Sequence, residues 1–365
     1  MFSNYSVISR VSRVEVRLCS GACLFFLALG LGIVTTSSGL AAAKTPLQRF
    51  QYSLPRMGTI FRIEMYAASD AEASKAAEAA FDRAEELEQV MSDYRTDSEL
   101  ARLMRDGNAA PFPVSSDLYD VLAKSLWTSK LSQGYFDVSI APLVDLWRSA
   151  RKNGRLPDPA EIAKAKALVD YRNIELDPVH HTVFLKRAGM KLDLGAIGKG
   201  YAADQMLAVL QSQGIRHALV VAGGEVVTGE PPPGSSGWKV RIDTADSDAG
   251  AVPCTLLLSA RAVSTSGDEH QFLEVKGHRY SHVINPLTGW ALEGSSSTTV
   301  MARDSTTADA LATAFSLMSV ADGIRVAQSL PGVSALWVRR VGGEWKHYTS
   351  RGFPTSCHGL PKRSK

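Results

Sequence analysis

Hydrophobic and polar positions alternate along the first part of the chain in the manner of two strands joined by a turn. Residues 50–54 and 60–66 show the two-residue period of half-buried strands, and Met57-Gly58-Thr59 lies between them. The period then lengthens. Residues 69–91 and 117–131 are rich in helix formers and carry apolar residues at helical spacing. We therefore expect a hairpin followed by packing helices.

The rest of the chain contains segments with the two-residue period of strands and segments with the helical period. The expected elements are a surface loop at 148–159, a short helix at 160–168, a helix at 202–213, strands at 217–222, 238–243 and 254–258, helices at 306–318 and 321–330, and a hairpin of 333–341 and 344–348 linked by Gly342-Gly343. Helices that group between antiparallel-looking strands favour an α+β architecture over a doubly wound parallel sheet.

Composition and charge are those of an ordinary globular protein. The 365 residues are 45% hydrophobic, enough to bury one large core or two modest ones. The net charge is +3, of which residues 1–43 contribute +2 and the remainder +1. This balance does not indicate a nucleic-acid-binding surface, so no nucleic-acid partner is expected.

The first 43 residues have the features of a secretory signal peptide. A basic stretch ends at Arg17, an apolar core spans 22–34, and small residues at 40–43 predict cleavage after Ala43. The competing interpretation is an uncleaved membrane anchor, but thirteen apolar residues fall short of the roughly twenty that span a bilayer. A lipid anchor at Cys23 is disfavoured because the apolar core follows that cysteine. We expect a periplasmic protein, with anchoring to the inner membrane as the alternative.

Cleavage would leave few cysteines. Cys19 and Cys23 would be removed with the leader, and only Cys254 and Cys357 would remain. Two cysteines are too few for a disulfide framework, and the sequence leaves open whether they pair.

The most informative segment runs from Lys191 to Asp204 and contains glycines at 195, 198 and 200. Such a turn lets the backbone approach a ligand closely, and the amides that open the following helix can face an anion. Lys199 would add a positive charge. The spacing matches neither a P-loop nor a dinucleotide fingerprint, so a simple tight turn stays open as the alternative.

A carboxylate and a hydroxyl follow more than a hundred residues later. Asp309 and Thr313 are four residues apart, so they share one face of the expected helix. Oxygen ligands of this kind suit Mg²⁺, which takes few protein ligands when it also holds a diphosphate. An aspartate among alanines and leucines needs such a partner. The alternative is that Thr306 or Thr307 caps the helix and Asp309 only interacts with its dipole.

Short blocks of sequence recur in a recognisable order over about residues 55–320. The blocks are Met57-Gly58-Thr59, Met91-Ser92-Asp93-Tyr94 with 98–100, Phe136-Asp137-Val138 with 141–147, the 191–204 segment, Ala222-Gly223-Gly224-Glu225, 262–268, 280–289 and 307–313. Together they resemble the FAD:protein FMN transferase family, also called ApbE-like. Each block is loose alone, but their shared order makes the match specific.

The resemblance implies a fold and a reaction. It implies an α+β protein with mixed or antiparallel sheets and packed helices forming two lobes around a flavin-nucleotide cleft. Residues 44–350 would be the catalytic domain, between the leader at 1–43 and a basic tail at 351–365. A Mg²⁺-dependent transferase of this kind cleaves the diphosphate of FAD and releases AMP. It attaches FMN through a phosphoester bond to a threonine of a partner flavoprotein. For this chain we expect the partner to be an envelope flavoprotein, such as a subunit of a membrane redox complex.

The resemblance also implies a role for individual residues. The side chains of Asp309 and Thr313 and the backbone carbonyl of Ala196 would bind Mg²⁺. The positions that would contact the flavin nucleotide are Met57, Tyr94, Phe136, Asp137, Asp193, Lys199 and Val283. His282 would assist proton removal from the incoming threonine, with Asp309 as the second catalytic residue.

Three positions depart from the family pattern. Asn285 stands where an aspartate is usual, which would weaken an acid/base role shared with His282. Glu225 stands where aspartate or asparagine is commoner. Gly198 replaces a common alanine, which should loosen the turn slightly.

Two other functions use the same residues. If water replaced threonine, the protein would be an FAD pyrophosphatase that yields FMN and AMP. The other alternative is a periplasmic protein that binds FAD without converting it. Loss of the metal-binding residues would indicate such a protein, but Asp309 and Thr313 are both present.

Overall fold

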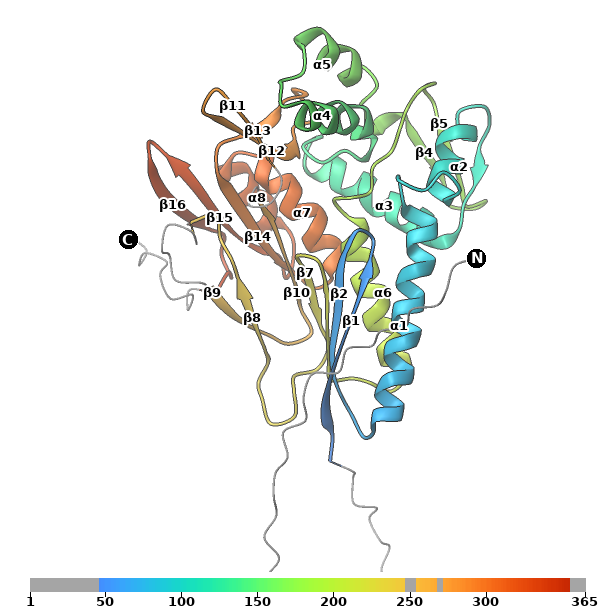
Figure 1. The fold of residues 1–365 in the computed structure, drawn as a ribbon, viewed down its shortest axis with the longest axis vertical. Coiled ribbons are helices and arrows are strands. Elements are labelled where there is room, and N and C mark those ends of the chain that lie inside the picture. Colours follow the sequence, from blue (N-terminus) through green and yellow to red (C-terminus); the bar gives the residue numbers. More distant parts are fainter. Residues whose placement is uncertain (1–45, 247–253, 268–271, 355–365) are drawn as a thin grey trace, which may run out of the picture.

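The computed structural model describes residues 46–246, 254–267 and 272–354, and its architecture is α+β (Figure 1). The main sheet consists, in spatial order, of β1 (Gln48–Arg56), β2 (Thr59–Ala67), β6 (Ala218–Ala222), β7 (Glu225–Thr228), β10 (Ala262–Gly267), β14 (Ser296–Ala302), β15 (Ser334–Val341) and β16 (Glu344–Thr349). All neighbouring strands in this sheet are antiparallel. The expected fold class is therefore confirmed.

Smaller sheets and helices fill the intervals between these strands. One smaller sheet consists of β8 (Trp238–Ile242) and β9 (Cys254–Leu258). A second has the strand order β11 (Phe272–Val275), β12 (His278–Ile284), β13 (Ala291–Glu293). A third has the strand order β3 (Phe112–Pro113), β5 (Thr182–Leu185), β4 (Ile174–Asp177). The helices are α1 (Asp70–Met91), α2 (Glu99–Asp106), α3 (Ser116–Leu131), α4 (Ala141–Asn153), α5 (Pro159–Lys166), α6 (Gly198–Ser212), α7 (Ser305–Leu317) and α8 (Val320–Ser329), with 3-10 turns η1 (Val138–Ile140) and η2 (Tyr171–Asn173).

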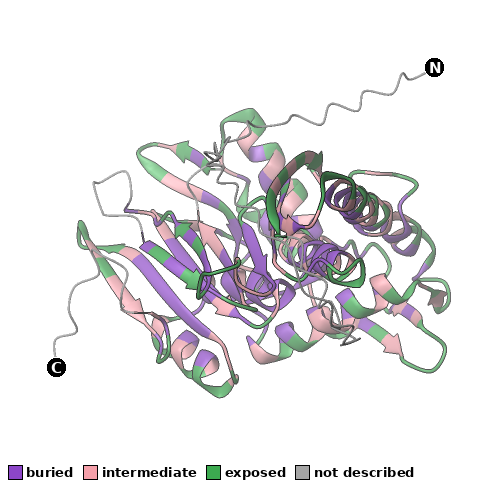
Figure 2. Ribbon diagram, turned by 90° about the horizontal axis from the view of Figure 1, so that it is seen from below, coloured by how far each residue is buried: buried purple, intermediate pink, exposed green. Residues whose placement is uncertain are grey.

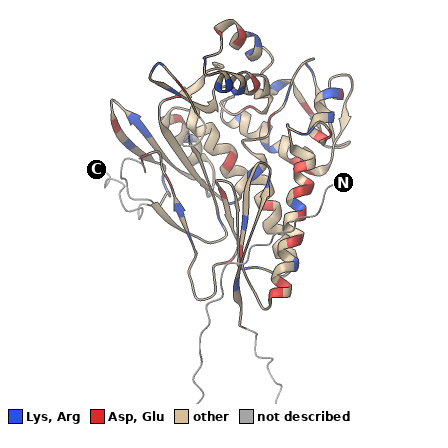
Figure 3. Cartoon of the chain, viewed as in Figure 1, with Lys and Arg blue, Asp and Glu red and all other residues tan. Residues whose placement is uncertain are grey.

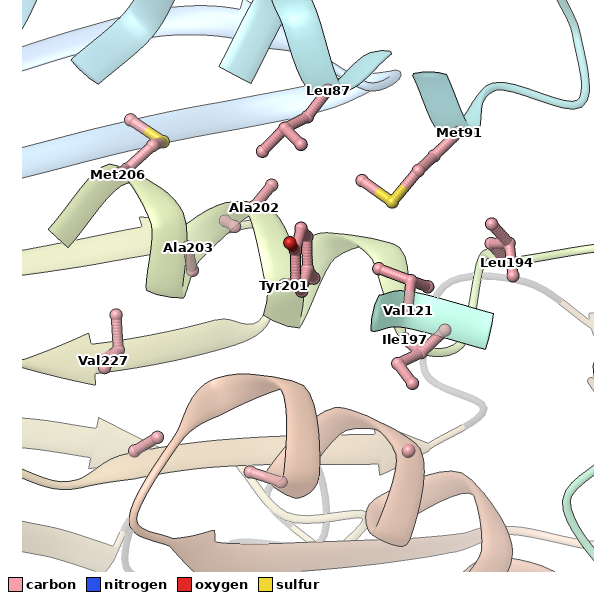
Figure 4. Packing of buried hydrophobic residues seen from close by; sticks show 14 of the residues in the cluster. Leu87, Met91, Val121, Leu194, Ile197, Tyr201, Ala202, Ala203, Met206 and Val227 are labelled. Carbon is pink, nitrogen blue, oxygen red and sulfur yellow. The ribbon is translucent and has the colours of Figure 1, made fainter. Parts of the chain in front are cut away.

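The main core lies between the large sheet and helices α1, α6 and α7, which pack against one another. Strand β2 contributes Phe61, Ile63 and Met65 at alternate positions, as its two-residue period predicts. Alanines on the facing sides of α1 and α6 let these two helices approach closely. Leu87 of α1 points toward the α6 segment that carries Ala202 (Figure 4).

The opposite face of the sheet is covered by the β8–β9 pair. Alternate residues of both strands are buried there, among them Trp238 and Leu256. Strand β10 contributes to both faces, because Ala262 belongs to the helical core and Val263 to this second cluster. Buried residues accordingly run through the middle strands of the sheet (Figure 2).

A third cluster joins α4 and α5 to the β11–β12–β13 sheet. Trp147 of α4 is fully buried in it, and its indole nitrogen donates a hydrogen bond of 2.9 Å to the carbonyl of Gly289. This bond connects two segments that are 142 residues apart in the chain. The expected aromatic block and the block that carries His282 are therefore fastened together.

Two predicted boundaries were wrong. Helix α4 continues to Asn153, through half of the stretch expected as a loop, because its residues tolerate a helix and Gly154 ends it in the left-handed conformation at φ +65°. Helix α6 begins at Gly198 and not at 202, so two of the glycines form its first turn.

The two hairpins were predicted correctly. Met57 and Gly58 have φ values of +48° and +73° and form the two-residue turn between β1 and β2. Gly342 and Gly343 form the corresponding turn between β15 and β16, with φ values of +61° and +88°.

The leader at 1–43 with Cys19 and Cys23, and Cys357 in the tail, lie outside the described residues. Cys254 is buried at the start of β9. Within the described ranges, none of the helices combines the length and apolar character needed to traverse a bilayer.

Candidate active site

The glycine turn is a compact structure whose amides are largely satisfied internally. The amide of Gly195 donates to Oδ1 of Asp193 at 2.7 Å, and that of Gly198 to the carbonyl of Leu194 at 2.7 Å. The Gly200 amide donates to Asp309. Two of these amides therefore face carboxylates of the protein itself, those of Asp193 and Asp309. The glycines also allow tight turning and close packing.

Gly200 is the contact point between α6 and α7. A Cβ atom at this position would lie 2.8 Å from Cβ of Asp309 and closer still to the carbonyl oxygen of Ser305. The main chain of α6 therefore lies directly against α7. Oδ2 of Asp309 accepts the Gly200 amide at 3.0 Å, and Asp309 is only 4% exposed. The two distant motifs meet at this bond.

The amino terminus of α7 is held by two other carboxylates. Asp304 is the N-cap and accepts the amide of Thr307 at 2.7 Å. Asp204 of α6 accepts the amides of Ser305 and Thr306, each at 2.8 Å. The alternative in which Thr306 or Thr307 caps the helix was therefore wrong, and Asp309 lies one turn beyond the capped end.

Lys199 brings a positive charge to the same place. Its Nζ donates to the carbonyl of Gly195 at 2.9 Å and lies 3.5 Å from Oε1 of Glu225. Burial alone would lower the pKa of Lys199, but the carboxylates of Glu225, Asp309 and Asp193 outweigh it and raise the pKa. The ammonium is thus held charged beneath the glycine turn.

Glu225 and Asp309 are buried carboxylates that influence each other. Burial raises the pKa of both, and repulsion from Asp309 adds to the increase at Glu225, although Lys199 opposes it. Oε2 of Glu225 is buried and accepts no hydrogen bond from any described residue. Two acidic groups therefore share one ammonium in a site from which water is largely excluded.

This donor set is suited to a hard divalent cation. Thr313 follows Asp309 by one helical turn, and Ala196 lies two residues before α6, the helix that α7 packs against. A carboxylate, a hydroxyl and a carbonyl are the oxygen donors that magnesium accepts while it keeps water or phosphate ligands. Within the described residues, no three His, Cys, Asp or Glu side chains gather around a common point. An ion at this site would depend on backbone and hydroxyl oxygens beside the carboxylates.

Asp193 and Tyr94 are joined by Arg148, a residue that the sequence did not single out. The guanidinium of Arg148 lies 2.9 Å from Asp93 and 3.4 Å from Asp193, and it stacks over the ring of Tyr94 with 4.8 Å to the centroid. Tyr94 is 77% exposed, so its other surface is available. Basic residues mark this part of α4 in Figure 3. Arg148 was missed because it was placed in a loop.

Phe136 and Asp137 lie inside the protein. Phe136 is buried in the main core. Asp137 accepts hydrogen bonds from the amide and hydroxyl of Ser139 and from the amide of Tyr171, at 2.7–2.9 Å. Burial raises the pKa of Asp137, and these bonds oppose the increase. Its carboxylate fastens η1 to η2.

Met57 lies in the β1–β2 turn, and its side chain packs against the main core. Its amide donates to Oε2 of Glu88 at 3.0 Å, and a pocket of about 500 Å³ beside this turn is lined by Gly58, Thr59 and Glu88, among others. A second pocket of about 500 Å³ lies along α6, and Tyr201 and Asp204 are among the residues that line it.

His282 is exposed on β12, a strand that contacts α7. The pairing of β12 with β13 is irregular between Tyr280 and Ile284, as in a β-bulge, and such irregularities re-aim side chains. The neighbouring Val283 is buried. Oδ1 of Asn285 accepts the amide of Leu287 at 2.9 Å, a turn-forming bond that an aspartate would also make.

The fold and site define a class of protein: an α+β protein in which a glycine turn, an ammonium and buried carboxylates meet at α7, a helix that also contacts the strand bearing an exposed histidine. The sequence model of the ApbE family matches residues 57–337. The chain therefore belongs to the ApbE family.

Curated relatives and solved structures agree with this assignment. An FAD:protein FMN transferase of Treponema pallidum is 33% identical over 77% of this chain and 82% of its own length. One from Vibrio cholerae is 30% identical over 86% of this chain and 94% of its own length. The solved flavin transferase ApbE from Vibrio cholerae has a TM-score of 0.76 and 29% identity, and the match covers 84% of this chain and 99% of that one. All three of these relatives are named as transferases.

Proposed function

We propose that this protein is a Mg²⁺-dependent FAD:protein FMN transferase. The observation that carries the proposal is the hydrogen bond between Gly200 and Asp309, which joins the glycine turn to the carboxylate helix. Family membership and the names of the relatives support the flavin and transfer parts of the proposal. The donor chemistry of the site supports magnesium, whereas the threonine acceptor and the release of AMP are what the family resemblance implies.

The metal part of the proposal rests on charge and donor type. Asp309, Thr313 and the carbonyl of Ala196 would hold the ion, and the ion would neutralise charge on the diphosphate as the phosphorus–oxygen bond breaks. Lys199 would contribute a second positive charge near the phosphates. Its ammonium is already fixed by Gly195 and Glu225, so little reorganisation is needed when substrate arrives.

The transfer step forms one phosphorus–oxygen bond and breaks another. The threonine hydroxyl oxygen attacks the phosphorus on the FMN side of the diphosphate, the threonine proton passes to a base, and AMP leaves with the bridging oxygen. His282 is our candidate base because it is exposed on a strand that contacts α7. Positioning by the protein supplies much of the rate in reactions of this type.

The flavin nucleotide would be held on both sides of the glycine turn. Tyr94 offers an exposed ring that Arg148 holds from one side, and Met57 lies in the β1–β2 turn, next to Gly58 and Thr59, which line a pocket. Asp193 would accept hydroxyl or amine hydrogens. Phe136, Asp137 and Val283, being buried, would support this surface from behind.

The location and partner follow from the same proposal. We propose that the leader directs export to the periplasm and that the acceptor is a threonine of an envelope flavoprotein. Mass spectrometry of envelope proteins from a strain that lacks this chain should reveal a protein that has lost covalent FMN. An unchanged set of flavinylated proteins would contradict this part.

The decisive assay combines the purified protein with FAD, Mg²⁺ and a threonine-bearing acceptor peptide. Transferase activity gives AMP together with peptide-bound flavin, and a pyrophosphatase gives AMP with free FMN. A carrier gives neither product. Asp309→Ala should abolish turnover and preserve much of the FAD affinity, because the ion acts chiefly on charge that develops during transfer. Unchanged turnover in that variant would remove Asp309 from the site.

A further inference from the structure

Glu225 has a feature that neither the family resemblance nor the proposed roles explain. It is the first residue of β7, directly after the Gly223-Gly224 turn, and β7 contacts both α6 and α7. The residue is 5% exposed, and its Oε2 accepts no hydrogen bond from any described residue. A buried carboxylate oxygen without a partner is costly, so its retention points to a partner that arrives with the ligands.

The charges around Glu225 do not balance. Its Oε1 lies 3.5 Å from Nζ of Lys199, whose ammonium also interacts with Asp309 and Asp193. The same ammonium is hydrogen-bonded to the carbonyl of Gly195. One positive charge therefore serves several carboxylates, and burial leaves the excess negative charge poorly solvated.

We propose that Glu225 supplies the second carboxylate of the divalent-cation site, beside Asp309. This inference rests on the proposed function, because it assigns a residue to the same ion. The unpartnered Oε2 would face the ion or a water molecule of its first shell, since Mg²⁺ usually keeps several waters. Glu225 is then a determinant of cation affinity, in addition to its contact with Lys199.

The competing explanation is that Glu225 acts only through Lys199. Loss of the carboxylate would then leave the ammonium with one negative partner fewer, and its charge would repel the cation more strongly. A double-mutant cycle separates the two explanations. If the carboxylate acts on the cation itself, Glu225→Gln weakens cation binding in the Lys199→Met background as well. If it acts only through Lys199, Glu225→Gln has no effect in that background.

The test is isothermal titration calorimetry with MgCl₂ on the purified full chain without FAD, supported by the rise in melting temperature that Mg²⁺ produces. We expect Glu225→Gln to raise the dissociation constant at least tenfold in both the wild-type and Lys199→Met backgrounds. Glu225→Asp, which retains a carboxylate, should bind Mg²⁺ more tightly than Glu225→Gln. The matched control is Glu230→Gln, which removes an exposed carboxylate and should leave the isotherm unchanged.

The outcomes separate the inference from the function on which it rests. Asp309→Asn should lose Mg²⁺ binding. If it does, and Glu225→Gln binds as the unaltered protein does, the inference is overturned and the proposed function stands. An effect of Glu225→Gln that vanishes in the Lys199→Met background also overturns it. If the unaltered protein does not bind Mg²⁺ and transfers FMN without it, the magnesium part of the proposed function fails first.

Discussion

Replacement of Gly200 by alanine tests the packing that brings the two motifs together. The added Cβ would meet Asp309 and the main chain of Ser305, so α6 and α7 would have to move apart. Overpacking of this kind costs about 1–3 kcal/mol. Weakening the hydrogen bond between the Gly200 amide and the Asp309 carboxylate costs about 1.5–3 kcal/mol more. Alanine regains about 1 kcal/mol through helix propensity. The free energy of unfolding should therefore fall by about 1.5–5 kcal/mol.

Gly198→Ala is the matched control, because it makes the same change in the same helical turn. A Cβ at position 198 would meet Sδ of Met91 at 3.7 Å and Cβ of Leu194 at 3.9 Å, which are ordinary contacts. The control should be neutral or gain about 0.5–1 kcal/mol. Guanidinium denaturation followed by circular dichroism measures both variants. Equal free energies of unfolding for the two variants would refute the argument that Gly200 sets the distance between the helices.

Three further predictions concern pH, positioning and proton transfer. Burial raises the pKa of Asp204 to about 6 from an ordinary value of 3.8, despite its hydrogen bonds to the start of α7. Because the folded pKa is the higher one, the stability from this group is complete below about pH 4 and is lost as the pH rises through 6, by at most about 3 kcal/mol. Urea denaturation should show a smaller fall over this range in Asp204→Asn than in the unaltered protein, because Asp137, Glu225 and Asp309, whose pKa values burial also raises, still titrate. Arg148→Ala should raise the KM for FAD at least fivefold with a smaller change in kcat, and Arg148→Lys should restore part of the loss, as measured by steady-state kinetics. His282→Ala should lower FMN transfer to peptide far more than hydrolysis of FAD by water, as measured by chromatography of the products.

Each of these predictions has an outcome that contradicts it. An Asp204→Asn variant with the same pH profile as the unaltered protein would show that this carboxylate is not the titrating group. A fall in kcat without a change in KM for Arg148→Ala would place that arginine in the chemical step instead of in flavin binding. Equal losses of transfer and hydrolysis in His282→Ala would indicate that the histidine positions the cofactor.

The helix with the longest periodic pattern could be predicted closely from the sequence, whereas several strands, including the seven-residue β14, could not. The expected helix at 69–91 is α1 almost to the residue, since twenty-two residues with one period leave little ambiguity. Strands β4, β5 and β7 have four residues each and were not predicted. In so short a strand the local pattern is weak, and pairing with distant strands decides the structure.

The site could be predicted only as far as its residues occur in recognisable blocks. Asp309 and Lys199 lie in such blocks, and the structure brings both to the glycine turn. Arg148 could not be found this way, because its partners Asp93 and Asp193 are 55 and 45 residues away and no local pattern connects them. The hydrogen-bond partner of the Gly200 amide could not be predicted either, because it is Asp309 of α7, which lies 109 residues later in the chain.

The strands of the large sheet lie in space in the same order as they occur in the chain. Each new strand can therefore be added at the growing edge, and no segment has to be inserted between strands already paired. The residues proposed to take part in catalysis lie mostly in the segments that connect consecutive strands of this sheet. Lys199 lies between β2 and β6, and His282 lies between β10 and β14. These connecting segments can change in length or sequence during evolution without shifting the strand register of the large sheet. The preference for an acceptor protein can therefore diverge while the sheet stays the same.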